Sequence, residues 1–218
     1  NDSNQMMTGA YVQVSGDTLR IVALDGRRIA IRQVELSGQY IDCEAIIPGK
    51  ALSEVSKILI DDPDRNVSIR FTGNHALFEF DGTTVVTSLI GGKYIQVDKM
   101  LTDDFHTRIT ANKGHLVSAI DRASIFTSES DKKPIVLNVQ DGNLNISIKS
   151  ALGTFSDDVE VDEEGTDLML GLNPKFVLDV LKVIDSDDVS LYFSGQKTPC
   201  IIRDEEKSYI YMVLPVSI

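Results

Sequence analysis

The stretch VSLYFSG at residues 189–195 repeats an earlier stretch, VSIRFTG at residues 67–73. Each follows an amphipathic segment, IIPGKALSEVSKIL at 46–59 and GLNPKFVLDVLKVI at 171–184. The amphipathic segments align at an offset of 125 residues and the two short stretches at an offset of 122, so the loops between them differ by only three residues. Agreement of several elements in the same order is improbable by chance. The pattern therefore predicts a duplicated domain.

We place the two predicted domains at residues 1–103 and 104–218. A third match supports them, because residues 16–19 fall on residues 141–144 at the same offset of 125. Each half contains alternating apolar and polar residues separated by Gly-bearing turns, which is typical of antiparallel strands. With the amphipathic helix in each half, this predicts an α+β fold in tandem copies.

Local signals place individual elements within each copy. The dipeptide Asp25-Gly26 lies inside TLRIVALDGRRIAIRQV, which predicts a β-hairpin with a two-residue turn. Helix starts are predicted at Pro48 and at Asn173-Pro174, because proline is favoured in the first turn of a helix. The second copy has a further predicted helix at residues 112–126.

Composition excludes several classes of protein. The 218 residues contain 42% hydrophobic and 25% charged residues, as in an ordinary water-soluble domain, and no apolar run reaches the length of a membrane helix. A formal net charge of −12 argues against a protein that coats nucleic acid. Cys43 and Cys200 lack metal-ligand or redox-motif spacing, so we expect two buried, reduced thiols and a cytoplasmic location.

The sequence gives little support for catalysis. His75, His106 and His115 have no metal-ligand spacing and no accompanying nucleophile motif. The acidic stretches at 156–164 and 185–188 lack the spacing of a calcium-binding loop, so we interpret them as solvated loop charge. We expect no enzymatic activity, no metal and no cofactor. An enzyme that uses the acidic stretches as a metal site is retained as an alternative.

The two copies carry the same pair of lysines. Lys50 falls on Lys175 and Lys57 on Lys182 at the offset of 125, and each pair is spaced seven residues apart on one helix face. One interpretation is a solubilising surface paired with acidic neighbours. The other is a functional basic face, favoured by its recurrence.

The chain ends are also unusual. Residues 212–216, MVLPV, are apolar, and they either pack into their own domain or line a groove for a partner's hydrophobic residues. The helix at 112–126 has no counterpart in the first copy, because an offset of 125 places that counterpart before residue 1. With no Met at position 1, this predicts that the chain is an N-terminally truncated piece of a longer protein.

In these features the sequence resembles the bacterial sliding clamp, the beta subunit of DNA polymerase III. Members carry a TDGHRxA-like stretch where this chain has LDGRRIA at 24–30. They have an N-x-x-Y/F-hydrophobic-x-D helix start, matched here by Asn173, Phe176 and Asp179. They end in a hydrophobic-x-P-hydrophobic strand, like Leu214-Pro215-Val216. The match covers essentially all 218 residues and corresponds to the last two of the family's three domains.

The resemblance implies a ring. In this family two subunits meet head to tail as a homodimer, with sheets outside and helices lining a central channel around double-stranded DNA. A ring held by topology needs only a weak local basic lining and can be acidic overall. Lys50, Lys57, Lys175 and Lys182 would then contact phosphates without reading sequence. We expect this chain alone, without the first domain, to be monomeric.

The resemblance also implies a groove between the last two domains. In this family the groove binds a short hydrophobic peptide of the DNA polymerase III alpha subunit, the clamp loader and other proteins with a clamp-binding motif. Carried over by position, its lining would be Met7, Leu24, Gly26, Arg27, Arg28, Ile29, Ile95, Lys99, Met100, Asn173, Phe176, Met212, Val213, Leu214, Pro215 and Val216. The second interpretation is a two-domain β-rich interaction scaffold that has no role on DNA.

Overall fold

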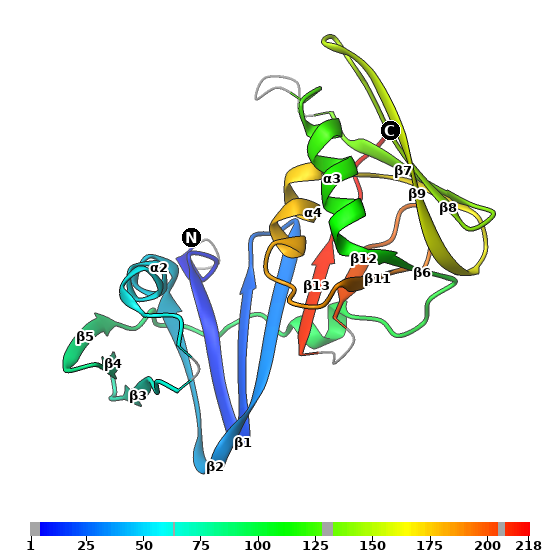
Figure 1. The fold of residues 1–218 in the computed structure, drawn as a ribbon. Coiled ribbons are helices and arrows are strands. Elements are labelled where there is room, and N and C mark those ends of the chain that lie inside the picture. Colours follow the sequence, from blue (N-terminus) through cyan, green and yellow to red (C-terminus); the bar gives the residue numbers. More distant parts are fainter. Residues whose placement is uncertain (1–4, 63, 128–132, 205–207) are drawn as a thin grey trace. The chain divides into compact units, whose positions relative to one another are not determined.

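The computed structural model describes residues 5–62, 64–127, 133–204 and 208–218 (Figure 1). The chain forms two compact units, and each is described by itself below. Unit 1 contains Asn1–Gly26 and Ile31–Gln96, and unit 2 contains Arg27–Ala30 and Val97–Ile218. These units are defined by internal contacts, so the domain bounds 1–103 and 104–218 stay predictions about the duplication.

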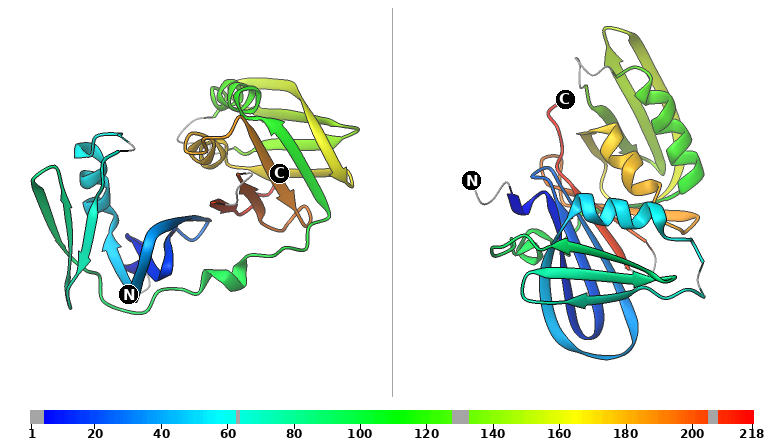
Figure 2. Two further views of the ribbon diagram at one scale, coloured as in Figure 1. Left: turned by 60° about the horizontal axis from the view of Figure 1, so that its bottom comes forward. Right: turned by 90° about the vertical axis from the view of Figure 1, so that its left-hand side faces the viewer.

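Unit 1 contains the long strand β1 (Gly9–Leu24) and most of a second long strand, β2 (Arg28–Pro48), whose first three residues belong to unit 2. The two strands are drawn in blue in Figure 2. Gly16, in the middle of β1, has a φ of +61°, and its N–H donates to Oδ1 of Asp42 on β2 at 3.0 Å. The positive φ is one that glycine adopts without steric cost. The predicted hairpin is therefore present as part of a longer folded ribbon.

The turn between β1 and β2 differs from the prediction. It contains three residues, Asp25, Gly26 and Arg27, instead of two. Gly26 supplies the expected positive φ, +82°. Arg27 is the additional residue, and its carbonyl accepts a hydrogen bond from the Leu214 N–H at 2.9 Å within unit 2. The turn is therefore one residue longer than the local sequence predicts.

Unit 1 also includes helix α2 and a three-stranded sheet. Helix α2 (Gly49–Ile58) begins directly after Pro48, as predicted, and buries Val55. The antiparallel strands β3 (Ser68–Phe71), β4 (His75–Phe80) and β5 (Thr83–Ser88) follow in that order in the sheet. One cluster of buried residues in unit 1 joins β1, β2, α2 and β4, and it consists of Val12, Ile47, Val55, Ala76, Phe78 and Phe80.

Unit 2 is larger. Its strands are β6 (Thr107–Asn112), β7 (Ile135–Gln140), β8 (Asn143–Ser150), β9 (Gly153–Gly165), β10 (Leu168–Leu172), β11 (Asp188–Phe193), β12 (Cys200–Arg203) and β13 (Tyr209–Val213). They are antiparallel neighbours in the order β13-β12-β11-β6-β9-β8-β7-β10. Helices α3 (Lys113–Ser124) and α4 (Pro174–Leu181) contribute to a core that includes residues of all eight strands. A short 3-10 helix, η1 (Val97–Met100), precedes them.

The duplication is visible in the order of elements. Helix α2 is followed by the sheet β3-β4-β5, and helix α4 by the neighbouring strands β11-β12-β13. The residues that precede the two helices, Pro48 and Asn173, are the pair that the sequence offset predicts. The predicted α+β fold in tandem copies is confirmed.

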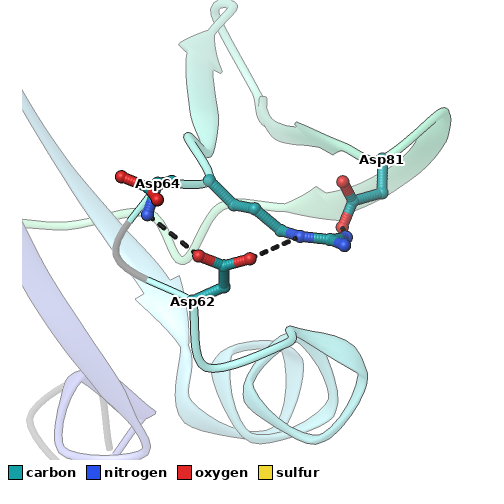
Figure 3. A network of polar contacts seen from close by, with 4 residues as sticks. Asp62, Asp64 and Asp81 are labelled. Carbon is teal, nitrogen blue, oxygen red and sulfur yellow. Dashed lines mark hydrogen bonds and ion pairs between the residues drawn. The ribbon is translucent and has the colours of Figure 1, made fainter.

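Both units use the same tight turn between neighbouring strands. Asp81-Gly82 joins β4 to β5, and Asp141-Gly142 joins β7 to β8, with φ between +46° and +74° at all four residues. Two successive positive φ values define the hairpin turn that matches the natural twist of the strands. In unit 1 the turn is tied to the loop after α2, because Arg65 binds Asp81 at 2.8 Å and Asp62 at 3.1 Å (Figure 3).

One acidic stretch is not a loop, so that prediction is wrong. Residues 156–164 lie within strand β9. Val159 and Val161 are buried there, whereas the acidic residues between and beside them face outward. The stretch pairs with β8 on one side and with β6 on the other, which provides hydrogen-bond partners for its backbone N–H and C=O groups. Alternation with two valines, rather than the acidic composition, decides the conformation.

The two cysteines differ in burial, which corrects the prediction that both are buried. Cys200 is fully buried, whereas Cys43 is only partly buried, and its neighbours Asp42 and Glu44 are exposed. Desolvation raises the pKa of the buried Cys200 thiol, and it also raises the pKa of the partly buried Cys43 thiol.

Candidate peptide-binding site

Three segments of unit 2 meet at the start of α4. Asn173 precedes the helix, and its side-chain Oδ1 accepts the Lys175 N–H at 3.0 Å, while Pro174 occupies the first turn. This cap fixes the direction of the first turn. Phe176 and Asp179, three residues apart, then lie on one face of the helix.

Arg28 lies over this face. Its guanidinium carbon is 4.3 Å from the centroid of the Phe176 ring, and its Nη1 is 2.7 Å from Asp179 Oδ2. The Tyr211 hydroxyl, on strand β13, accepts a longer bond of 3.4 Å from the same Nη1. The arginine thus covers an aromatic face and is ion-paired at the same time. Its side chain remains 28% exposed, so the cluster borders the solvent.

The C-terminal residues form a further part of the candidate site. Met212 and Val213, at the end of β13, are buried in unit 2, whereas Leu214 is 38% exposed. Two backbone hydrogen bonds fix the tail, from Leu214 N–H to Arg27 O at 2.9 Å and from Val216 N–H to Gly171 O at 2.8 Å. The first residues of the apolar ending therefore pack inside the unit, and Leu214 is exposed to solvent; that the ending lines a groove for a partner stays a prediction.

Gly171 permits this arrangement of the tail. A Cβ atom at this position would lie 2.6 Å from the carbonyl oxygen of Val216, closer than non-bonded atoms approach. Sequence reasoning did not select Gly171, because its role depends on a segment 45 residues later in the chain. It also did not place Asp179 in the site, although the spacing of three residues from Phe176 is a helical signal that could have found it.

The residues of the predicted groove divide between the two units. Arg27, Arg28, Asn173, Phe176 and Leu214 are brought together in unit 2 by the contacts above. The other members in unit 2 are Ile29, Met212 and Val213, which are buried, Pro215 and Val216, which are partly exposed, and Lys99 and Met100 on η1, which are exposed. The members in unit 1 are Met7, Leu24, Gly26 and Ile95. A groove formed from both units stays a prediction.

All four predicted DNA-facing lysines have exposed side chains. Lys50 and Lys175 lie in the first turn of α2 and α4, respectively. Lys57 forms an ion pair with Glu54 at 2.8 Å, which offsets part of its charge, and Lys182 lies directly after the last turn of α4. The repeated placement is therefore real, and its use on DNA stays a prediction.

Among the described residues, no group of three or more His, Cys, Asp or Glu side chains lies close enough together to hold a metal ion. None of the helices within those ranges has the length and apolar character needed to cross a membrane.

Comparison with known proteins assigns the family. The model of the DNA polymerase III beta subunit central domain matches residues 1–96, and that of its C-terminal domain matches residues 98–217. A beta sliding clamp of Staphylococcus epidermidis is 30% identical over 219 aligned positions, which cover 99% of this chain. The chain spans 58% of the length of that relative.

Solved structures agree with this assignment. A crystal structure from Eubacterium rectale assigned to the DNA polymerase III beta subunit is 45% identical, with a TM-score of 0.95, and the match covers 99% of this chain and 59% of that one. The DNA polymerase sliding clamp of Bacillus subtilis is 29% identical, with a TM-score of 0.94 and coverage of 100% and 58%. Because the two family models together span almost every residue, the chain belongs to the DNA polymerase III beta subunit family of sliding clamps.

Proposed function

We propose that the chain serves as the peptide-binding part of a DNA sliding clamp. In this role it tethers replicative and repair polymerases to DNA through a short hydrophobic segment of the partner. The observation that supports this most is the cluster of Arg28, Phe176 and Leu214 in unit 2: Arg28 lies over the Phe176 ring, and the exposed Leu214 is hydrogen-bonded through its backbone to Arg27, the neighbour of Arg28. The partners we propose are the polymerase alpha subunit, the clamp loader and other proteins with the same motif.

The chemistry of the cluster suits an apolar peptide. Leu214 provides aliphatic surface to be buried, and buried apolar area is the main source of affinity in such sites. Met100, 48% exposed on η1, has a flexible side chain that adapts to different partners. The backbone around Leu214 is fixed by its bond to Arg27, so little ordering is required on binding.

The test is the binding of a fluorescent hydrophobic pentapeptide of the clamp-binding type, followed by anisotropy. We expect a micromolar Kd for the chain and at least a tenfold loss for Leu214→Asp, because the charge occupies the proposed apolar contact. Leu152→Asp is the matched control, since Leu152 is 63% exposed in the turn between β8 and β9. This variant should bind the peptide as well as the parent chain does. Met212 is unsuitable for this substitution, because it is buried and a charge there would disturb folding.

Two results would count against the proposal. Absence of binding by a chain with an intact thermal melting transition would contradict the peptide site. Equal losses in Leu214→Asp and Leu152→Asp would place the binding elsewhere.

We further propose that the helices α2 and α4 face duplex DNA in the assembled ring. The repeated, exposed lysines Lys50 and Lys175 at the two helix starts favour this role. In a ring assembled from subunits that contain this chain, Lys50→Glu with Lys175→Glu should reduce salt-sensitive retention on circular DNA severalfold. Lys149→Glu on strand β8 combined with Lys197→Glu in the loop before β12 is the control of equal charge change, because both lysines are exposed. Unchanged retention in the double variant would favour the scaffold without a role on DNA.

A further inference from the structure

The carboxylate of Asp179 has a partner that its place in the duplication does not predict. Its counterpart in unit 1 at the offset of 125 is Glu54, which pairs with Lys57 on its own helix at 2.8 Å. Asp179 instead binds Arg28, a residue 151 positions earlier in the chain, at 2.7 Å. The same helical position therefore has a local structural role in one unit and a long-range role at the candidate site in the other.

Two of the interactions that hold Arg28 in place come from helix α4. The stacking of its guanidinium on Phe176 and its ion pair with Asp179 are each modest at a site that is partly open to water. Because Phe176 and Asp179 are three residues apart on α4, the rigid, planar guanidinium can satisfy both at once. The result is an arginine that lies over the ring, with a carboxylate beside its positive charge.

We propose that Asp179 is a positioning residue that sets the specificity of the proposed peptide site. It holds Arg28 on Phe176 and neutralises the arginine's charge, so that this end of the site accepts neutral apolar segments in preference to acidic ones. This inference rests on the proposed peptide-binding function. The ligand it concerns is a short hydrophobic peptide, and the discrimination is between neutral and acidic side chains next to its apolar anchors.

The test compares two pentapeptides, one neutral and one in which a single polar position is glutamate. In Asp179→Asn Arg28 loses this carboxylate while its other contacts remain, and we expect the affinity ratio of the acidic to the neutral peptide to rise about five- to tenfold. Asp179→Glu should restore the original ratio, since it keeps the carboxylate. Arg28→Gln combined with Asp179→Asn should remove the gain, because the gain depends on the arginine.

Glu54→Gln is the matched control. It removes the carboxylate at the corresponding position in unit 1, where the partner is Lys57, and should leave the ratio unchanged. A rise of the same size in this variant would mean that the effect is one of net charge only and would overturn the inference.

A measurement without peptide tests the positioning directly. The side-chain protons of Arg28 should show an upfield ring-current shift in NMR spectra, which Asp179→Asn should diminish and Asp179→Glu should preserve. Peptide binding with an unchanged ratio, or an unaltered ring-current shift in Asp179→Asn, would overturn the inference and leave the proposed function intact. Failure of the folded parent chain to bind either peptide would instead overturn the proposed function itself.

Discussion

At the scale of single residues, the candidate site depends on backbone contacts as well as on side chains. The absence of a side chain at Gly171 allows the tail to lie against β10, where Val216 N–H bonds to its carbonyl. The carbonyl of Arg27 accepts the Leu214 N–H and so fixes the backbone at that residue. Both contacts place Leu214 at the edge of the core without touching its side chain.

Gly171→Ala is expected to displace the tail. The added Cβ would meet the Val216 carbonyl oxygen at 2.6 Å and the side chains of Ile218 and Pro134 at 3.2 and 3.3 Å, so the backbone must move. Overpacking of this kind costs about 1–3 kcal/mol of stability. Faster hydrogen exchange at the Val216 amide and a lower melting temperature would confirm it. Gly73→Ala, with open space around it, is the control, and equal effects in the two variants would contradict the prediction.

Asn173→Ala is expected to weaken the start of α4. The substitution removes the acceptor for the Lys175 N–H, and loss of such a cap typically costs about 1 kcal/mol. The urea midpoint of unfolding measures the loss. Asn173→Asp should retain most of the stability, because its carboxylate can accept the same bond; a midpoint as low as that of the alanine variant would argue against the cap as the cause.

At the scale of elements, the segment between η1 and β6 is fastened to the sheet of unit 2. Arg203 on β12 is 8% exposed, and its Nη2 binds Asp103 Oδ1 at 2.9 Å. The guanidinium also lies 5.2 Å from the Phe105 ring and 5.3 Å from the Tyr192 ring. One buried arginine therefore holds an otherwise irregular segment by charge and by stacking.

Arg203→Ala should loosen this segment. Loss of the charged and stacking contacts is expected to cost about 1–3 kcal/mol locally. We expect faster hydrogen exchange at His106, whose N–H donates to the Phe193 carbonyl at 2.9 Å. Arg70→Ala is the control, because its pair with Glu79 is exposed and contributes little. Unchanged exchange at His106 would show that the other contacts of the segment suffice.

At the scale of the whole molecule, the two units differ in the size of their cores. The core of unit 2 includes both helices and all eight of its strands, whereas the cluster in unit 1 joins two long strands, one helix and β4. More buried apolar surface gives more stability per unit. Unit 1 is therefore expected to be the less stable of the two.

The cysteines report on this difference, because each unit contains one. Cys43 lies in unit 1 and Cys200 in unit 2. In pulsed thiol labelling across a urea gradient, Cys43 should become fully reactive at lower urea than Cys200. Without urea, the raised pKa of Cys200 and its complete burial should keep that thiol unreactive, and labelling of Cys43 should increase as the pH rises above the ordinary value for a thiol. Coincident transitions for the two thiols would indicate a single cooperative unit.

The sequence by itself determined the duplication, the α+β class and the starts of α2 and α4, because period, capping and helix-start signals act over a few residues and do not need distant partners. The interpretation of residues 156–164 as a loop was wrong, because the alternation with two buried valines outweighs the acidic composition. Only the tertiary structure decided that Arg28 lies on Phe176 beside Asp179, and that Gly171 receives the tail. These contacts join residues far apart in the chain, and local periodicity carries no information about which distant residues the packing of a core brings together.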